Sequence, residues 1–350
     1  MTFNKKILGS LVLTTLLASC GSSEKPVSKE NNKTKEITVY TALENEQIPE
    51  YLQSFKEQYP NIKLNIVRES TGVIVSRVLA EKDNPQADVV WGTAATGLLV
   101  LDEANLLKEY SPKDIEKINP KFKDNTGKDP KWVGNNAWMT AISVNTIEMK
   151  KLGLEEPKNF SDLLKPEYKG LISMPNPASS GTGFLTVSAL VQLLGEEKAW
   201  EYMASLDNNM GVYTHSGSKP AKTAASGEYP IGISYGYPGI KIKNDGAPIN
   251  VYFPNEGSGW DSEANALINK KNIKDEAKVF LDWAISEDAM KMYAKSYAIV
   301  SRDINVAPPK GFPENPINQL IANDFSWAAA NKERILTTWE TKFGSKTEKK

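Results

Sequence analysis

The sequence E-I-T-V-Y-T-A at residues 36–42 begins the alternation of strands and helices that decides the fold. Its apolar residues predict a buried strand, and residues 47–59 carry apolar side chains at helical spacing. Residues 62–67 and 87–91 predict two further strands, with a helix over residues 72–82 between them. Because strands that alternate with helices form mainly parallel sheets flanked by helices, the sequence predicts an α/β fold.

The length of the chain indicates two lobes. About 315 residues follow the N-terminal segments, which is more than one hydrophobic core comfortably holds. Apolar strands predicted at residues 137–145 and 249–254 are placed to cross between the lobes. We therefore expect a first lobe of residues 36–138 and 255–350 and a second lobe of residues 139–254. Each lobe is expected to hold a mostly parallel sheet, and two hinge strands join them.

The loop M-P-N-P-A-S-S-G-T-G-F at residues 174–184 leads into an apolar, helix-periodic segment. Two prolines hold its approach extended, so no helix should begin before Ala178. The first N–H groups of a helix have no internal partner and attract a phosphate, phosphonate or carboxylate. An ordinary helix cap explains the same residues. The residues of this candidate anion cradle are Ser179, Ser180, Gly181 and Thr182.

Polar residues also follow the three strands of the predicted first sheet. In α/β sheets ligands bind beyond the carboxyl ends of the strands, so these residues are binding candidates. Arg68 and Glu69 are expected instead to pair with each other on the surface. Ser70 and Thr71 serve equally well as helix N-caps. The candidates from these strand ends are Tyr40, Thr41, Glu44, Ser70, Thr71 and Trp91.

The N-terminus has the features of a bacterial lipoprotein leader. Two lysines precede an apolar run that is too short to span a bilayer, and small residues precede Cys20, the only cysteine. We expect residues 1–19 to be removed as a signal peptide and Cys20 to carry lipid. Residues 20–35 are expected to form a disordered tether, and the Lys-rich C-terminal tail to be disordered as well. The predicted location is the cell envelope, on the extracytoplasmic side of a membrane.

Composition and motifs argue against two classes of protein. A formal net charge of −1 does not favour a nucleic-acid binder. The S-G-S-K string at residues 216–219 fits the S-x-x-K motif of serine acyl enzymes, but the accompanying S-D-N and K-T-G strings do not occur in the sequence. His215, the only histidine, is better explained as a structural residue than as a general base. The sequence therefore predicts a binding protein, with an acyl-transfer enzyme as a distant alternative.

Six segments share a pattern with one family: V-Y-T-A-L-E-N-E-Q-I, R-E-S-T-G, N-P-Q-A-D-V-V-W-G, M-P-N-P-A-S-S-G-T-G, Y-T-H-S-G-S-K-P and N-D-F-S-W-A-A-A-N. Together they resemble the solute-binding lipoproteins of 2-aminoethylphosphonate ABC importers, within the clan of type II periplasmic binding proteins. The resemblance covers nearly all of residues 37–343. It implies a monomer of two α/β lobes that closes over a small solute without a cofactor and docks on a membrane permease with its ATPase.

A zwitterionic phosphonate fits the polar residues of this pattern. The cradle would hold the phosphonate, with the loop at residues 216–219 closing on its remaining oxygens through Ser216, Ser218 and Lys219. Glu44, Asp261 or Glu263 would meet the ammonium group, and Glu44 and Asp261 rank first because both are expected at strand or hinge ends facing the cleft. Aromatic walls would come from Tyr40, Trp91, Tyr235, Tyr237 and Trp260.

The same clan includes ferric-ion-binding proteins, which by resemblance use a His, a Glu and two adjacent Tyr. Here the corresponding positions hold Glu44 and Thr93, and the tyrosines are split as Tyr235-Gly236-Tyr237. This departure counts against iron, although carboxylate and phenolate oxygens do bind ferric iron. The alternative is therefore iron(III) with a synergistic anion, with Glu44, Tyr235 and Tyr237 as the metal ligands.

Overall fold

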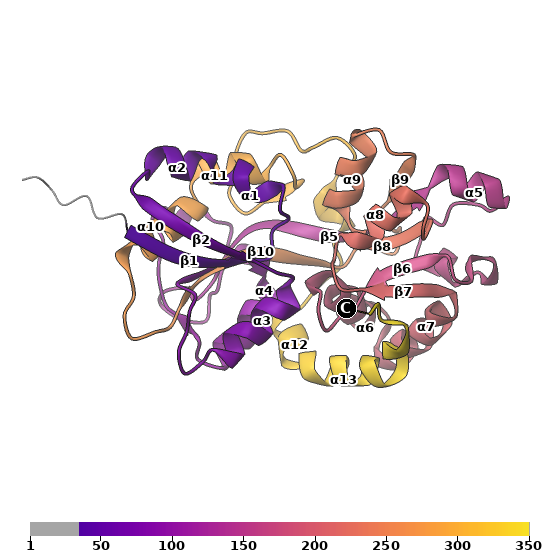
Figure 1. Cartoon of the computed structure of the whole chain (residues 1–350), viewed down its shortest axis with the longest axis horizontal. Helices are drawn as coiled ribbons and strands as arrows, with labels where there is room; N and C mark the ends of the chain where they lie inside the picture. The colour runs from indigo at the N-terminus through magenta and orange to yellow at the C-terminus, as the bar shows by residue number, and fades with distance from the viewer. Residues whose placement is uncertain (1–34, 350) are drawn as a thin grey trace, which may run out of the picture. The chain divides into compact units, whose positions relative to one another are not determined.

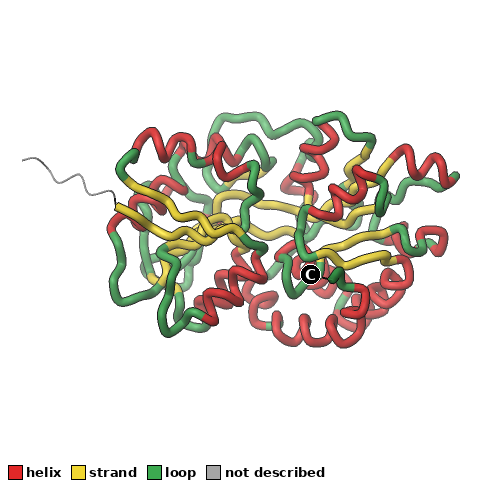
Figure 2. Tube along the Cα trace, in the orientation of Figure 1, coloured by secondary structure: helices red, strands yellow, loops and turns green. Residues whose placement is uncertain are grey.

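The computed structural model describes residues 35–349. The predicted signal peptide, Cys20 and nearly all of the predicted tether lie outside this range. Within it, strands run through the middle of two halves and helices cover them (Figure 1, Figure 2). None of the helices in this range is long and apolar enough to cross a membrane.

Three parallel strands form the core of the first half, in the order β2-β1-β3. They are β1 (Lys35–Thr41), β2 (Ile62–Arg68) and β3 (Val89–Ala94). The connecting helices are α1 (Gln47–Tyr51), α2 (Gln53–Gln58), α3 (Thr71–Ala80) and, after β3, α4 (Ala95–Glu103). The predicted alternation is therefore confirmed, except that the helix predicted over residues 47–59 is two short helices.

Strand β5 (Val133–Asn145) connects the two halves. Its first part pairs antiparallel with β10 (Trp260–Ile268), which in turn pairs with β3, and its second part pairs antiparallel with β8 (Ile231–Tyr235). The complete order is β2-β1-β3-β10-β5-β8-β6-β7. Two short strands, β4 (Leu107–Lys108) and β11 (Ile299–Val300), pair with β10 and β5. The sheets are thus mixed, with parallel strands joined through antiparallel crossing strands.

The second half repeats the parallel pattern with β6 (Ile172–Pro175) between β7 (Met210–Thr214) and β8. Its helices are α5 (Thr146–Leu152), α6 (Gly181–Leu194), α7 (Glu196–Asn209), α8 (Lys219–Ser226) and α9 (Gly236–Asn244). The return crossing predicted at residues 249–254 is wrong, because β9 (Ile249–Tyr252) pairs with β5 inside this half. The chain returns through β10 instead.

The last helices of the chain join different cores. In the first half, α10 (Asp275–Ala284) packs against β1 and β3, and α11 (Glu287–Tyr293) packs against α1 and β5. Helix α12 (Phe325–Ala330) lies against α4. Helix α13 (Lys332–Phe343) places Trp339 4.8 Å from the ring of Tyr213 on β7, in the core of the second half. The assignment of all of residues 255–350 to the first lobe is therefore wrong for α13. The apolar face of α13 predicts that the helix packs against the protein, but it does not indicate which of the two sheets the helix packs against.

Candidate ligand-binding site

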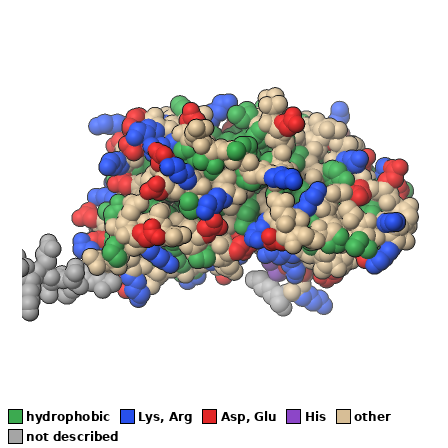
Figure 3. All heavy atoms as spheres, turned by 90° about the horizontal axis from the view of Figure 1, so that it is seen from above, with side chains coloured by type: hydrophobic (Ala, Val, Ile, Leu, Met, Phe, Trp, Pro, Cys, Tyr) green, Lys and Arg blue, Asp and Glu red, His purple; other side chains and the backbone are tan. Residues whose placement is uncertain are grey.

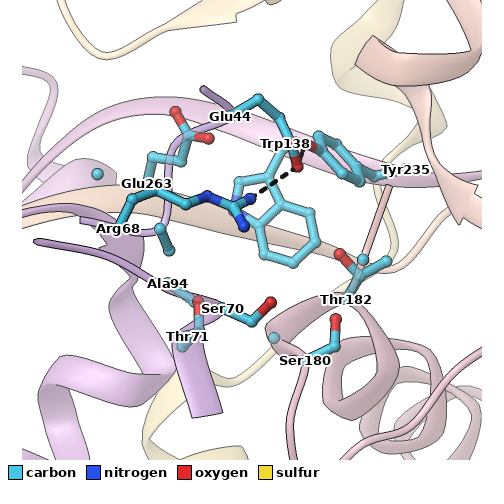
Figure 4. Close-up of a pocket in the computed structure, with 14 residues that line it drawn as sticks. Glu44, Arg68, Ser70, Thr71, Ala94, Trp138, Ser180, Thr182, Tyr235 and Glu263 are labelled. Carbon is cyan, nitrogen blue, oxygen red and sulfur yellow. Dashed lines mark hydrogen bonds and ion pairs between the residues drawn. The ribbon is translucent and has the colours of Figure 1, made fainter. Parts of the chain in front are cut away.

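A pocket with an empty volume of about 420 Å³, including its open mouth, lies where the two halves meet (Figure 4). Several of the predicted site residues line it, namely Glu44, Ser70, Thr71, Ser180, Gly181, Thr182 and Tyr235. The other lining residues are Ala42, Arg68, Gly92, Ala94, Trp138, Gly217 and Glu263. Residues from both halves of the chain therefore share one cavity.

Two helix N-termini open into this pocket. Helix α3 begins at Thr71, and the side chain of its N-cap residue Ser70 makes no capping hydrogen bond. Helix α6 begins at Gly181, and Ser180 caps it by accepting a hydrogen bond from the Gly183 N–H at 3.4 Å. The first N–H groups of both helices carry partial positive charge. The pocket is accordingly suited to an anion held between the two halves.

The two N-termini touch each other directly. The Gly72 N–H in the first turn of α3 donates to the Ser179 carbonyl at 3.1 Å. A Cβ atom on Gly72 would lie 2.2 Å from the Ala178 carbonyl oxygen, and one on Gly181 would lie 2.9 Å from Thr71 Oγ1. The approach at Gly72 requires glycine, because a Cβ atom there would clash with backbone, whereas at Gly181 the Thr71 side chain would have to shift.

Arg68 adds a full positive charge to the pocket. Its guanidinium Nε donates to the Leu43 carbonyl at 2.9 Å, and Nη2 lies 3.3 Å from Glu44 Oε1 (Figure 4). The predicted surface pair of Arg68 with Glu69 is wrong. Arg68 is the last residue of β2 and lies beside Thr41 of β1, and neighbouring residues in extended backbone point to opposite sides.

Glu44 is held by groups from both halves. Tyr235 donates its hydroxyl to Glu44 Oε1 at 3.1 Å, and Lys222 Nζ lies 3.8 Å from Oε2. Only 6% of the Glu44 surface is exposed. Together with Arg68, these partners partly balance the Glu44 charge and link the first half to the second.

Glu263 is a second carboxyl group in the pocket. It accepts hydrogen bonds from the Tyr297 hydroxyl at 2.5 Å and from Asn136 Nδ2 at 2.7 Å. Burial and, to a lesser extent, the nearby Glu44 carboxylate raise the pKa of Glu263 to about 7, against the lowering effect of its hydrogen bonds from Tyr297 and Asn136. A group whose protonation changes near neutral pH therefore lines the site.

Replacing Glu263 with Gln is expected to flatten the dependence of stability on pH. Since folding raises the pKa from 4.5 to about 7, the folded protein binds this proton more tightly than the unfolded chain. Stability from this group is therefore present below about pH 4.5 and is lost as the pH rises to about 7. The variant should gain on the order of 3 kcal/mol relative to wild type between pH 5 and 8.

Urea unfolding at these two pH values measures the difference, with Glu340→Gln on the exposed face of α13 as the control. Asp261 titrates in both proteins, so its contribution cancels. An identical pH dependence for wild type and Glu263→Gln would contradict the assignment.

The model of the bacterial extracellular solute-binding protein family matches residues 87–325. This chain belongs to that family. A probable ABC transporter periplasmic-binding protein of Sinorhizobium fredii, y4fP, is 27% identical and aligns with 75% of this chain and 73% of its own length. An uncharacterized protein of Haemophilus influenzae is 31% identical over 97% of this chain and 98% of its own length. Solute-binding proteins of this kind are extracytoplasmic components of ABC importers, not enzymes.

Solved structures of solute-binding proteins share the fold. The periplasmic binding protein AfuA of Actinobacillus pleuropneumoniae, with exogenous fructose-6-phosphate bound, matches with a TM-score of 0.83 at 29% identity, over 89% of this chain and 99% of its own. Iron-bound HitA of Pseudomonas aeruginosa matches with a TM-score of 0.73 at 19% identity, over 87% of this chain and 99% of its own. The predicted type II periplasmic binding protein fold is confirmed.

Asp261 does not face the binding pocket of this family member. Its carboxylate accepts from Thr96 Oγ1 at 2.6 Å and from the Ser262 N–H at 2.7 Å, and only 1% of its surface is exposed. Burial raises its pKa to about 6, against the lowering effect of the Thr96 hydroxyl and of the backbone N–H groups at the start of α4. Asp261 therefore caps α4, and its predicted contact with a ligand ammonium group is wrong.

Three other strand-end candidates also lie outside the pocket. Trp91 is fully buried and donates to the Tyr293 hydroxyl at 3.0 Å, within an aromatic cluster of the first core. Tyr40 donates its hydroxyl to Glu81 Oε1 at 2.9 Å, and Thr41 is fully buried. Their predicted roles as ligand contacts are wrong, because these side chains are turned into the cores. Sequence position at a strand end does not reveal the face on which a side chain lies.

The second polar loop contributes its glycine rather than its serines. Ser216 and Ser218 have their hydroxyl oxygens 3.2 Å apart, and neither lines the pocket, whereas Gly217 does. Ser179 donates to the His215 carbonyl at 3.1 Å, so it joins the two loops. These three serines make contacts within and between the two loops, but they do not line the pocket, contrary to the prediction.

The remaining aromatic candidates divide between pocket and core. Tyr235 lines the pocket with Trp138, and their rings meet edge to face with centroids 5.7 Å apart. Tyr237 lies in α9, packs against Tyr297 at 5.8 Å and does not line the pocket. Trp138 was missed because a tryptophan in an apolar crossing strand has the same pattern as a core residue.

Proposed function

We propose that this chain captures a small organic solute bearing a phosphate or phosphonate group and delivers it to an ABC permease and its ATPase. The observation that carries the proposal is the opening of the α3 and α6 N-termini into one pocket that also holds Arg68. Helix N-termini and an arginine are the groups that proteins commonly use for phosphoryl oxygens. Each charge-assisted hydrogen bond contributes about 1.5 to 3 kcal/mol.

The opposite end of the solute would meet Glu44, Glu263, Tyr235 and Trp138. Two carboxyl groups accept hydrogen bonds from an ammonium group, so 2-aminoethylphosphonate fits the pocket as the sequence resemblance predicts. The partial balance of Glu44 by Arg68 favours a second candidate, a sugar phosphate, whose hydroxyl groups donate without adding charge. The related AfuA, with fructose-6-phosphate bound, supports the same candidate.

Iron(III) receives less support as the solute. The guanidinium of Arg68 lies 3.3 Å from Glu44, and its positive charge would repel a trivalent cation there. Tyr237, one of the three predicted iron ligands, does not line the pocket. The described residues 35–349 contain no cluster of three or more His, Cys, Asp and Glu side chains placed to bind a metal.

The acyl-enzyme alternative also loses support. Lys219, which would have to act as the base of the S-x-x-K motif, forms an ion pair with Glu348. Ser216, the would-be nucleophile, has the Ser218 hydroxyl as its neighbour at 3.2 Å. Charged side chains of both signs are interspersed on the face shown in Figure 3, so that face offers no extended basic surface for a nucleic acid. The proposal includes a lipid on Cys20, which would tether the protein to a membrane.

Calorimetric titration tests the proposal. The mature chain, unfolded and refolded to remove bound solute, is titrated with 2-aminoethylphosphonate, fructose 6-phosphate, inorganic phosphate, and ferric citrate. Saturable one-to-one binding of an organic phosphate or phosphonate, tighter than inorganic phosphate, is the expected result. Binding of ferric citrate alone, with a tyrosinate-to-iron colour, would replace the proposal with iron transport.

Glu44→Gln separates the two candidate solutes. If Glu44 meets an ammonium group, the variant should weaken 2-aminoethylphosphonate more than ethylphosphonate, which lacks the amine, by roughly tenfold. The matched substitution Glu46→Gln, in the exposed turn before α1, serves as the control. Equal losses for both phosphonates would remove Glu44 from the ammonium role.

A further inference from the structure

The C-terminal tail of the described chain lies along the edge of the second sheet. Strand β7 ends the order of strands, and Thr347 forms a parallel β-bridge with Tyr213 on it. The Glu348 N–H donates to the Tyr213 carbonyl at 2.9 Å. The end of the described chain is accordingly seen beside β7 and α6 (Figure 1). Thr347 and Glu348 therefore pair with the sheet, and the predicted disorder is wrong for these residues of the tail.

The side chain of Glu348 binds the loop at residues 215–219. Its Oε1 accepts from the His215 N–H at 2.5 Å, and its Oε2 forms an ion pair with Lys219. The Glu348 side chain is only 16% exposed. One carboxylate thus holds both ends of the short loop that contains Gly217.

Thr347 binds the other loop of the anion site. Its hydroxyl accepts a hydrogen bond from Asn176 Nδ2 at 2.9 Å. Asn176 in turn accepts from the Ala178 N–H at 2.7 Å through Oδ1 and from the Ser180 N–H at 3.0 Å through its carbonyl. Asn176 is therefore the residue that shapes the approach to α6, and the tail fixes its side chain.

Both loops reach the pocket through residues that the tail does not touch. Gly217 and Ser180 line the pocket, and a Cβ on Gly217 would lie 3.0 Å from Ser180 Oγ and 2.5 Å from Thr182 Oγ1. The Ser179 hydroxyl joins the loops by donating to the His215 carbonyl at 3.1 Å. A small shift of either loop would therefore change the position of the groups that face the solute.

We propose that residues 347–348 are a positioning clamp that fixes the two anion-binding loops of the second half from behind. This inference rests on the proposed function, because it assigns the clamp to the same site. Glu348 and Thr347 are positioning residues, since they contact no pocket-lining residue. By holding the loops in the bound geometry before the solute arrives, they lower the entropy lost on binding.

Two truncations of the mature chain test the clamp. One ends at Lys346 and lacks it, and the control ends at Glu348 and lacks only the last two lysines. With 2-aminoethylphosphonate and fructose 6-phosphate as probes, the chain ending at Lys346 should bind roughly tenfold more weakly than the control. In the ligand-free protein, amide hydrogen exchange at residues 176–180 and 215–218 should be faster without the clamp, while exchange in the first half stays unchanged.

Affinity equal to the control would overturn the inference, provided that the unaltered chain binds a probe. If the unaltered chain binds neither probe, the proposed function fails, and the hydrogen exchange of the two loops still tests the clamp. Should the shorter chain unfold, the full-length variant carrying Thr347→Val and Glu348→Gln replaces it. In that variant, unchanged exchange at both loops would overturn the inference.

Discussion

Replacing Arg68 with Gln is expected to weaken binding of a phosphate- or phosphonate-bearing solute by roughly 100-fold, because truncating one partner of a buried charge pair costs about 2 to 5 kcal/mol. Arg68 supplies the full positive charge that lines the pocket beside the two helix N-termini. Its loss removes charge-assisted hydrogen bonds to the solute and leaves Glu44 less balanced, so an anion is repelled more strongly. Calorimetric titration of wild type and variant measures the loss.

Arg77→Gln is the matched control for this result. Arg77 lies on α3, the helix that follows Arg68 in the chain, but it pairs with Glu81 at 3.0 Å and does not line the pocket. The control should bind as wild type does. Arg68→Gln also distinguishes organic phosphates from ferric iron as the solute, because removing a cation from the site would strengthen the binding of ferric iron. Tighter binding of ferric citrate by Arg68→Gln, with unchanged binding of organic phosphates, would contradict the proposed function.

Replacing Gly72 with Ala is expected to keep the two halves apart and to weaken solute binding by roughly 10- to 100-fold, because affinity falls with the population of the closed state. The added Cβ would lie 2.2 Å from the Ala178 carbonyl oxygen, and backbone cannot rotate out of the way as a side chain can. Alanine is otherwise a better helix former than glycine, so α3 itself should not be destabilised.

Small-angle scattering with bound solute should give a larger radius of gyration for Gly72→Ala than for wild type. The neighbouring substitution Val73→Ala is the control, because Val73 is 39% exposed in the same turn of α3. If Gly72→Ala closes to the wild-type radius and binds with wild-type affinity, the contact between the α3 and α6 N-termini plays no part in closure.

The periodicity of the sequence predicts the positions of the helices and strands well. It predicts less well which core or strand each of them packs against. Alternating strands and helices predict the parallel strands of both halves, since that alternation has few other solutions. The apolar face of α13 predicts burial, but it fits either core equally, so the sequence predicts the wrong lobe for Trp339. The pairing of β9 with β5 was missed for the same reason.

The site is predicted where it depends on backbone and missed where it depends on side-chain direction. Ser180 is the N-cap residue of α6 and Thr71 is the first residue of α3, and both follow strands, a feature visible in the sequence. Trp91 and Asp261 lie near the same strand ends but turn into the interior, which no local pattern reveals. The sequence does contain a signal against the predicted pair of Arg68 and Glu69, because adjacent residues of an extended strand point to opposite sides.

The crystal structure of the protein with its tightest organic phosphate or phosphonate is the most direct test of the central claim. The account predicts that the phosphoryl oxygens lie within hydrogen-bond distance of the N–H groups that begin α3 and α6, with the Arg68 guanidinium beside them. It also predicts that the rest of the solute points toward Glu44 and Glu263. A phosphoryl group bound elsewhere, or a metal ion held by Glu44 and Tyr235, would contradict it.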